Sequence, residues 1–238
     1  FVRSMPEEQN RVVTDHVSEL LFVPTDVAVA NLTAEGITSG VHVVGDVMYD
    51  AALLFAPVAA EREGSEKYGR GKGEDILVTV HRAAATDTRE ALVSLVEVLR
   101  SLGSPAIFPV HPRTRAKLEA AGLWDDLRSI PDLHVAPPVG YLDFTNLLTP
   151  ARAVVTASGG VQKAAYIHGI TCITLRDETE WVETVNGGFN TLTGMNPERV
   201  VAALARTDFP AERPDYYGDG DAAGKITKLL HGWADARA

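Results

Sequence analysis

Short apolar runs alternate along this chain with longer segments of helical periodicity, and this alternation limits the folds open to it. The runs are continuously apolar, which is typical of parallel strands buried on both faces of a sheet. Alternation of strands and helices on this scale predicts an α/β fold with a doubly wound, Rossmann-like parallel sheet. The expected strands are Leu20–Val23, Val41–Val44, Ile76–Val80, Ala106–Val110, Leu133–Ala136, Ala153–Thr156, Thr171–Leu175 and Asn190–Leu192.

Helices are expected in the segments between these runs and at the end of the chain. Thr88–Leu102 places Leu92, Leu95 and Leu99 on one apolar stripe. Further helices are expected at Pro112–Ala121, Gly159–His168 and Ala222–Trp233.

The composition excludes several classes of protein. With 45% hydrophobic and 23% charged residues among 238, the chain is an ordinary globular protein and neither disordered nor fibrous. Its 22 Lys and Arg against 32 Asp and Glu give a net charge of −10, which argues against nucleic acid as the main partner. No apolar run approaches the ~20 residues that span a bilayer, so no membrane association is expected. The single cysteine, Cys172, lies in an apolar run and is expected to be buried; a reducing, cytoplasmic location follows.

Polar residues follow several of the expected strands, at the edge where open parallel sheets bind their ligands. His81 follows Ile76–Val80, and His111 follows Ala106–Val110. An imidazole in such a position can act as a general acid, donate to a phosphate, or simply lie on the surface. The histidines show no metal-ligand spacing with one another or with Cys172, so neither a metal nor a cofactor is predicted.

Ser158-Gly159-Gly160 is the strongest single motif, because it joins an expected buried strand to an expected helix. Glycine lets the backbone approach an anion closely, and the first N–H groups of the helix point toward it. The alternative interpretation is a plain N-cap with a tight turn. A second glycine-rich stretch, Gly69–Gly73, precedes a strand instead of following one, so we expect a flexible surface loop there and no phosphate site.

The chain begins at Phe1, without an initiator Met or a signal peptide, and opens on a motif-like stretch. We therefore interpret it as a piece of a longer protein. Within Met5–Arg11, Pro and Glu also suit the first turn of a helix, so composition alone leaves this stretch open between a structural and a functional role.

These motifs, taken in order, resemble those of the non-hydrolysing UDP-N-acetylglucosamine 2-epimerases over essentially the whole chain. The matching stretches are Arg3–Arg11, Val78–Arg82, Pro109–Pro112, Tyr141–Phe144, Ser158–Lys163, Leu175–Trp181 and Gly218–Gly220. Each stretch is weak alone, but seven in the family's order are specific.

The resemblance implies a glycosyltransferase-B-like fold of two Rossmann-like domains, the second of them complete in this chain and the first only partly present. Residues 1–40 would be a remnant of the N-terminal domain, 41–209 the C-terminal UDP-binding domain, and 210–238 a C-terminal helix returning to the first domain. The family's N-terminal basic residues and two of its catalytic acidic residues would lie before Phe1.

The resemblance also implies a reaction. The family eliminates UDP from UDP-GlcNAc to give a 2-acetamidoglucal and then adds UDP back, which yields UDP-ManNAc. Glu7 would be the carboxylate that acts at C2, and His81 would stabilise the leaving group or carry a proton. Substrate-binding roles would fall to Arg11, Phe144 at the uracil, Ser158, Gly159 and Gly160 at the diphosphate, and Arg176 and Glu180 at the mouth of the site.

Regulation and assembly are implied in the same way. His111 matches a residue that helps bind a second, regulatory UDP-GlcNAc in bacterial members of the family, and members are typically homodimers. The partner expected for this chain is thus a UDP-sugar and a second copy of itself.

Two departures from the family's pattern leave other functions open. Ala157 stands where the family usually has Asp, and Ala164 stands where it usually has the Glu that hydrogen-bonds the ribose. One alternative is a non-catalytic or degenerate nucleotide-sugar binding protein. Another is a glycosyltransferase of the same fold, against which the retained Glu7 stretch argues, because a transferase does not need that base.

Overall fold

The computed structural model describes residues 6–68, 73–210 and 212–237, which form two compact units. The smaller unit combines Phe1–Leu53 with Arg213–Ala238, and the larger unit is Leu54–Glu212. Most of the Gly69–Gly73 stretch lies outside the described residues, so its expected loop stays a prediction. The division into 1–40, 41–209 and 210–238 likewise stays a prediction about domains.

The larger unit is built on a six-stranded parallel sheet in the order β5-β4-β3-β6-β7-β8. All six expected strands of this region are confirmed, three of them with both bounds and three ending one residue earlier than expected. Their bounds are β3 Ile76–Thr79, β4 Ala106–Pro109, β5 Leu133–Ala136, β6 Ala153–Thr156, β7 Thr171–Thr174 and β8 Asn190–Leu192. This order is that of a Rossmann sheet, in which the chain starts in the middle and reverses direction once.

The helices of the larger unit follow the strands in turn. The expected helices in this unit are confirmed, that at Gly159–His168 with both bounds. The elements are the 3-10 helix η1 Ser65–Tyr68, α4 Ala83–Thr86, α5 Arg89–Ser101, α6 Pro112–Ala120, α7 Trp124–Arg128, α8 Tyr141–Leu148, α9 Gly159–His168, α10 Val182–Asn186 and α11 Pro197–Leu204.

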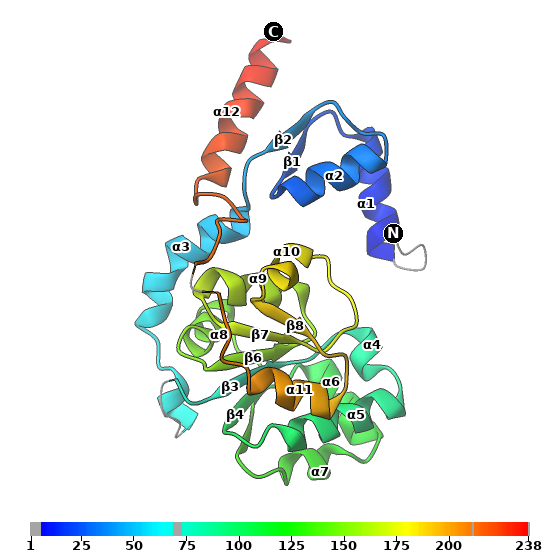
Figure 1. The fold of residues 1–238 in the computed structure, drawn as a ribbon, viewed down its shortest axis with the longest axis vertical. Coiled ribbons are helices and arrows are strands. Elements are labelled where there is room, and N and C mark those ends of the chain that lie inside the picture. The colour runs from blue at the N-terminus through cyan, green and yellow to red at the C-terminus, as the bar shows by residue number, and fades with distance from the viewer. Residues whose placement is uncertain (1–5, 69–72, 211, 238) are drawn as a thin grey trace. The chain divides into compact units, whose positions relative to one another are not determined.

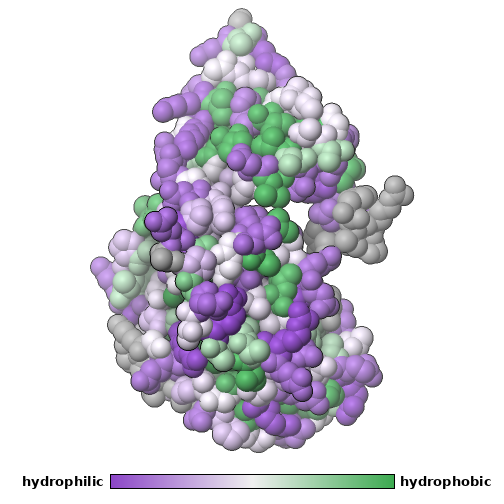
Figure 2. All heavy atoms as spheres, in the orientation of Figure 1, coloured by the Kyte–Doolittle hydropathy of each residue, from purple (hydrophilic) through white to green (hydrophobic). Residues whose placement is uncertain are grey.

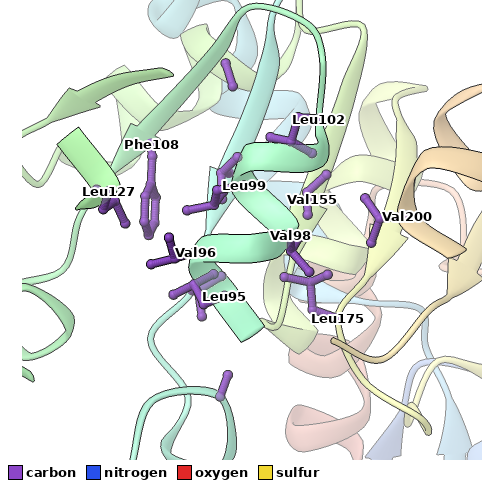
Figure 3. Packing of buried hydrophobic residues seen from close by; sticks show 14 of the residues in the cluster. Leu95, Val96, Val98, Leu99, Leu102, Phe108, Leu127, Val155, Leu175 and Val200 are labelled. Atoms are coloured by element: carbon purple, nitrogen blue, oxygen red, sulfur yellow. The ribbon is translucent and has the colours of Figure 1, made fainter. Parts of the chain in front are cut away.

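Alternate side chains of the central strands bury themselves on opposite faces of the sheet. On β3, Ile76 and Val78 join one apolar cluster, and Leu77, between them, joins the other. Helices α5, α6, α7 and α11 cover the first face, while α8 and α9 cover the second (Figure 1). Figure 3 shows the first cluster, where side chains of α5 pack against Phe108 and Val155 of the sheet. Burial on both faces explains the continuous apolar runs of the sequence.

The smaller unit has a two-stranded parallel sheet, β1 Leu21–Val23 paired with β2 Val41–Val43, and these two expected strands are confirmed. Its core is small and centres on three side chains, Leu21, Val23 and Leu32. The helices are α1 Pro6–Val17, α2 Asp26–Ala34, α3 Val47–Ala60, which continues into the larger unit, and α12 Ala222–Asp235.

A carboxylate distant in sequence caps the N-terminus of α12. Asp50, on α3, accepts hydrogen bonds from the backbone N–H of Ala222 at 3.1 Å and of Ala223 at 2.7 Å. The residue in the N-cap position itself, Asp221, makes no side-chain cap bond. The first N–H groups of a helix need acceptors, so Asp50 joins α12 to the start of α3.

The surface carries both polar and apolar residues. Apolar residues gather on the visible face of the smaller unit (Figure 2). Its exposed large apolar side chains include Val13, Val17, Val43, Val47 and Leu53. None of the helices that the structure describes combines the length and the apolar character needed to cross a membrane.

Candidate functional site

The sheet order places the candidate site between β3 and β6. The chain leaves β3 toward β4 on one side and later returns to β6 on the other, so this is the point where the sheet reverses. In open α/β sheets the crevice for a ligand lies beyond the carboxyl ends of the strands at such a point. The residues that follow these two strands are His81 and Ser158, both expected from the sequence as site residues.

Two threonines link the ends of these strands. Thr79 and Thr156 occupy paired positions, and their hydroxyl oxygens lie 3.0 Å apart in the buried interior. Thr156 Oγ1 also accepts a hydrogen bond of 2.9 Å from the backbone N–H of Ser158. This pair therefore orients the turn that leads into α9. Neither threonine was singled out from the sequence, although both are the last residues of neighbouring apolar runs.

The start of α9 carries the Ser158-Gly159-Gly160 motif. Ser158 is the N-cap residue with an extended backbone, and its hydroxyl makes no cap bond. The alternative of a plain serine cap therefore lacks its defining hydrogen bond. A Cβ placed on Gly159 would lie 3.3 Å from Trp181 Nε1, whereas one on Gly160 would meet nothing within 4 Å. Close packing thus favours glycine at the first position, and the second position has room for a side chain.

Two arginines converge beside this helix start on a single carboxylate. Arg82 Nη2 lies 3.2 Å from Glu180 Oε1, and Arg176 Nη1 lies 2.8 Å from Glu180 Oε2. Burial alone would raise the pKa of Glu180, but hydrogen bonds from its own backbone and from Arg176 hold that pKa below the usual value. The cluster carries a net positive charge next to the first N–H groups of α9, which have no acceptor within the helix, and this arrangement suits a phosphate ligand.

A pocket of about 210 Å³ opens at the ends of β3 and β4. Thr79, His81 and His111 supply its polar lining, and His81 and His111 have ring centroids 6.0 Å apart. Its apolar lining consists of Pro109, Pro138, Val139, Phe144 and Val161. Phe144 was expected at a uracil site, and an apolar pocket with a few polar groups suits a flat heterocycle. Val161 belongs to α9, so this helix also borders the pocket.

His111 caps α6 and thereby has a defined tautomer. Its Nδ1 accepts a hydrogen bond of 3.2 Å from the backbone N–H of Arg113. Because Nδ1 is the acceptor, a neutral His111 carries its proton on Nε2. In this tautomer His111 offers an N–H donor at Nε2.

His81 is biased toward its neutral form. Desolvation by the pocket lowers the pKa of His81 below 6.5, and the charges of His111 and Arg82 lower it further. A neutral imidazole can accept a proton at one ring nitrogen and donate a hydrogen bond from the N–H of the other, which suits a residue beside a leaving group.

Glu7 and Arg11 lie on α1 in the smaller unit. The side chain of Glu7 is outside the described part of the structure, so its catalytic role stays a prediction. Arg11 forms ion pairs of 2.7 Å with Asp15 and Glu35 and of 3.4 Å with Glu8. The hydrogen bond that Arg11 donates to the Glu35 carboxylate raises the pKa of Arg11 further above its usual value. Arg11 thus links α1 to α2, and its substrate contact stays a prediction.

The two alanines that depart from the family pattern have different surroundings. Ala157 is buried in the core beneath α5, with 1% of its surface exposed. Ala164 packs against the apolar cluster on the other face of the sheet.

Cys172 is buried as expected, and burial raises the pKa of its thiol to about 12. Among the described residues, no group of three or more His, Cys, Asp or Glu side chains is arranged to hold a metal ion.

The fold and this site define a class: an α/β protein with parallel sheets of the glycosyltransferase-B-like type, with polar groups at the switch point of its larger sheet. The sequence profile of the UDP-N-acetylglucosamine 2-epimerases matches residues 2–231. The chain belongs to this family.

Similar proteins support the assignment. A UDP-N-acetylglucosamine 2-epimerase homolog of Methanococcus maripaludis is 42% identical over 97% of this chain. The UDP-2,3-diacetamido-2,3-dideoxy-D-glucuronate 2-epimerase of Pseudomonas aeruginosa is 41% identical over 97%. The chain spans 65% of the length of the first relative and 64% of the second.

Solved structures of similar proteins share this fold. The UDP-GlcNAc 2-epimerase of Methanocaldococcus jannaschii, in complex with UDP-GlcNAc and UDP, is 37% identical with a TM-score of 0.85. The match covers 96% of this chain and 65% of that one. The Neisseria meningitidis enzyme bound to UDP-GlcNAc is 26% identical with a TM-score of 0.81, over 95% of this chain and 65% of that one.

Proposed function

We propose that this chain is the nucleotide-binding part of a UDP-sugar 2-epimerase that interconverts UDP-GlcNAc and UDP-ManNAc. The observation that carries the proposal is the pairing of β3 with β6, which brings His81 and the Ser158-Gly159-Gly160 turn to one edge of the sheet in a member of this family.

The uridine diphosphate would bind in two parts. The pocket lined by Phe144 would hold the uracil ring, and the first N–H groups of α9 would donate hydrogen bonds to the diphosphate. Arg82 and Arg176 supply positive charge beside that helix start. Positive charge and N–H donors stabilise the diphosphate more as its negative charge grows on leaving, which is the requirement for lowering the barrier.

The reaction would proceed by elimination and addition. A carboxylate, assigned to Glu7 by the family resemblance, removes the proton from C2 of the sugar, and the electron pair forms the C1=C2 double bond. The C1–O bond to the diphosphate breaks, and UDP leaves with both electrons of that bond. Re-addition of UDP at C1, with a proton delivered to the opposite face of C2, gives the epimer. His81 lies at the diphosphate, where it can donate a hydrogen bond to the leaving oxygen.

A second substrate is favoured by the Pseudomonas aeruginosa relative, which is as similar to this chain as the epimerase homolog is. That relative acts on UDP-2,3-diacetamido-2,3-dideoxy-D-glucuronate by its name. The chemistry at C2 is the same for both sugars, so the difference between them concerns recognition of the groups at C3 and C6.

Proton NMR in D2O tests the proposal with either substrate. The expected result with UDP-GlcNAc is deuterium at C2 and growth of a manno anomeric signal. If the C2 proton is replaced by deuterium only in the diacetamido-glucuronate substrate, that sugar nucleotide is the substrate. Retention of the C2 proton in both, with UDP still bound, would leave a nucleotide-sugar binding protein and remove the catalytic roles of Glu7 and His81.

Two further features of the proposal come from the resemblance: a homodimer and a regulatory UDP-GlcNAc site at His111. Sedimentation velocity at several protein concentrations measures the first. For the second, wild type and a His111→Ala variant are compared for the dependence of rate on UDP-GlcNAc concentration, and loss of sigmoidal dependence in the variant is expected.

A further inference from the structure

A buried glutamine on α9 connects this helix to the loop that carries Arg176 and Glu180. Gln162 is fully buried, with 0% of its surface exposed, one turn after Gly159. Its side-chain oxygen accepts a hydrogen bond of 2.6 Å from the hydroxyl of Thr179 and one of 3.0 Å from the amide of Asn190. The oxygen thus joins three segments that are separate in the sequence.

The partners of Gln162 are themselves held in place. Asn190 is buried, and its Oδ1 accepts a hydrogen bond of 2.7 Å from Thr174, the last residue of β7. Thr179 Oγ1 accepts a hydrogen bond of 3.2 Å from the backbone N–H of Trp181. The loop between β7 and α10 is therefore fixed at its centre by Thr179 and by the strand residue from which it departs.

This loop carries the groups that meet at the start of α9. Arg176 and Glu180 lie on either side of Thr179 and pair with each other at 2.8 Å. The loop has no strand or helix of its own, so few backbone hydrogen bonds define its path. A side-chain hydrogen bond to a buried acceptor then determines where the loop lies relative to α9.

We propose that Gln162 is a positioning residue, whose buried oxygen holds the 176–181 loop against the first turns of α9 and so places Arg176 and Glu180 at the diphosphate. The inference deepens the proposed function and rests on it for the identity of the ligand. It concerns the loop itself, so part of its test needs no ligand.

The direct test compares amide hydrogen exchange in the 176–181 segment of the full chain. Gln162→Leu keeps the volume of the side chain and removes the acceptor, and we expect at least tenfold faster exchange in this segment than in wild type, since each lost buried hydrogen bond is about a factor of ten. Val96→Ala is the matched control, because Val96 is a buried residue of α5 in the core cluster and makes no hydrogen bond to the loop. Equal exchange in the two variants would overturn the inference.

Variants at Thr179 separate positioning from loss of structure. Thr179→Val removes the hydroxyl that donates to Gln162, and Thr179→Ser keeps it. We expect the Thr179→Val variant to reproduce the faster amide exchange of Gln162→Leu and the Thr179→Ser variant to exchange at the wild-type rate. The double variant Gln162→Leu/Thr179→Val should exchange no faster than either single variant. Additive effects of the two changes would show that they act separately, which contradicts the inference.

Calorimetric titration with UDP provides the functional readout. The dissociation constant of Gln162→Leu should rise about tenfold, while that of Val96→Ala stays within about twofold of wild type. If wild type does not bind UDP, the proposed function fails, and the exchange experiment still decides whether Gln162 holds the loop. If wild type binds UDP and both variants bind equally well, the positioning role fails and the proposed function stands.

Discussion

Thr79 and Thr156 meet at the carboxyl ends of β3 and β6, with their hydroxyl oxygens 3.0 Å apart, although 77 residues separate them in the sequence. The same Thr156 oxygen accepts the backbone N–H of Ser158. One buried hydroxyl therefore connects the two central strands with the turn into α9.

Replacing this hydroxyl should destabilise the protein. Thr156→Val leaves the Thr79 hydroxyl without its hydrogen-bond partner and the Ser158 N–H without its acceptor in a buried place, which costs about 1–3 kcal/mol of unfolding free energy. Urea denaturation measures the loss. Thr79→Val is the control, because it removes the contact between hydroxyls and keeps the bond to Ser158. An equal loss in both variants would contradict a special role for Thr156.

The two glycines at the start of α9 should respond differently to alanine. Gly159→Ala places a methyl group 3.3 Å from Trp181 Nε1, so the indole has to shift slightly, and 3.6 Å from both Arg82 and Glu180, where it fills the space beside the helix start. Gly160→Ala meets nothing within 4 Å. We expect UDP to bind at least several-fold more weakly to Gly159→Ala than to Gly160→Ala, measured by calorimetric titration. The opposite order would argue against a ligand beside Arg82 and Glu180.

Stability should decrease in mild acid, in part because of His81. Its pKa lies below 6.5 in the folded protein, mainly through desolvation, and burial lowers the pKa of His168 in the same direction. As the pH falls below 6.5, these histidines bind protons more readily in the unfolded chain than in the folded one. Protonation therefore lowers the free energy of unfolding. At pH values above 7 the effect is absent, since these histidines are neutral in both the folded and the unfolded state.

Substitution isolates the contribution of His81 to the pH dependence of the unfolding free energy. Between pH 7.5 and pH 5, the unfolding free energy of His81→Gln should decrease less than that of wild type, and His168→Gln provides the corresponding comparison for the second histidine. Urea denaturation at the two pH values measures both. An unchanged pH dependence in His81→Gln would show that this imidazole titrates normally.

The cap that Asp50 provides for α12 should contribute measurably to the stability of the smaller unit. Asp50→Ala removes both acceptors from the N–H groups of Ala222 and Ala223, and the loss of such a cap costs about 1–2 kcal/mol. Asp221→Ala, at the formal N-cap position, removes no side-chain cap bond and should cost less. Far-UV circular dichroism during thermal unfolding measures both variants. A larger effect of Asp221→Ala would contradict the long-range cap.

Local patterns predicted much of this protein. The apolar runs identified the eight strands of the two sheets, and the residues after them included His81, His111 and Ser158. Such predictions succeed because a strand buried on both faces is mainly apolar and because charged and imidazole side chains gather where the burial ends. The glycine pair after β6 also indicated where α9 starts.

The tertiary structure decided which of these residues lie together. Arg82 meets Glu180 across 98 positions of sequence, and Asp50 caps a helix 172 positions later, because sheet order and helix packing bring those segments together. It also decided that the Arg11 guanidinium pairs with carboxylates of two helices. Periodicity specifies where strands and helices begin and which faces are apolar, but many strand orders would bury the same faces. Only the complete packing selects the order in which β3 lies beside β6, and with it the residues that share one site.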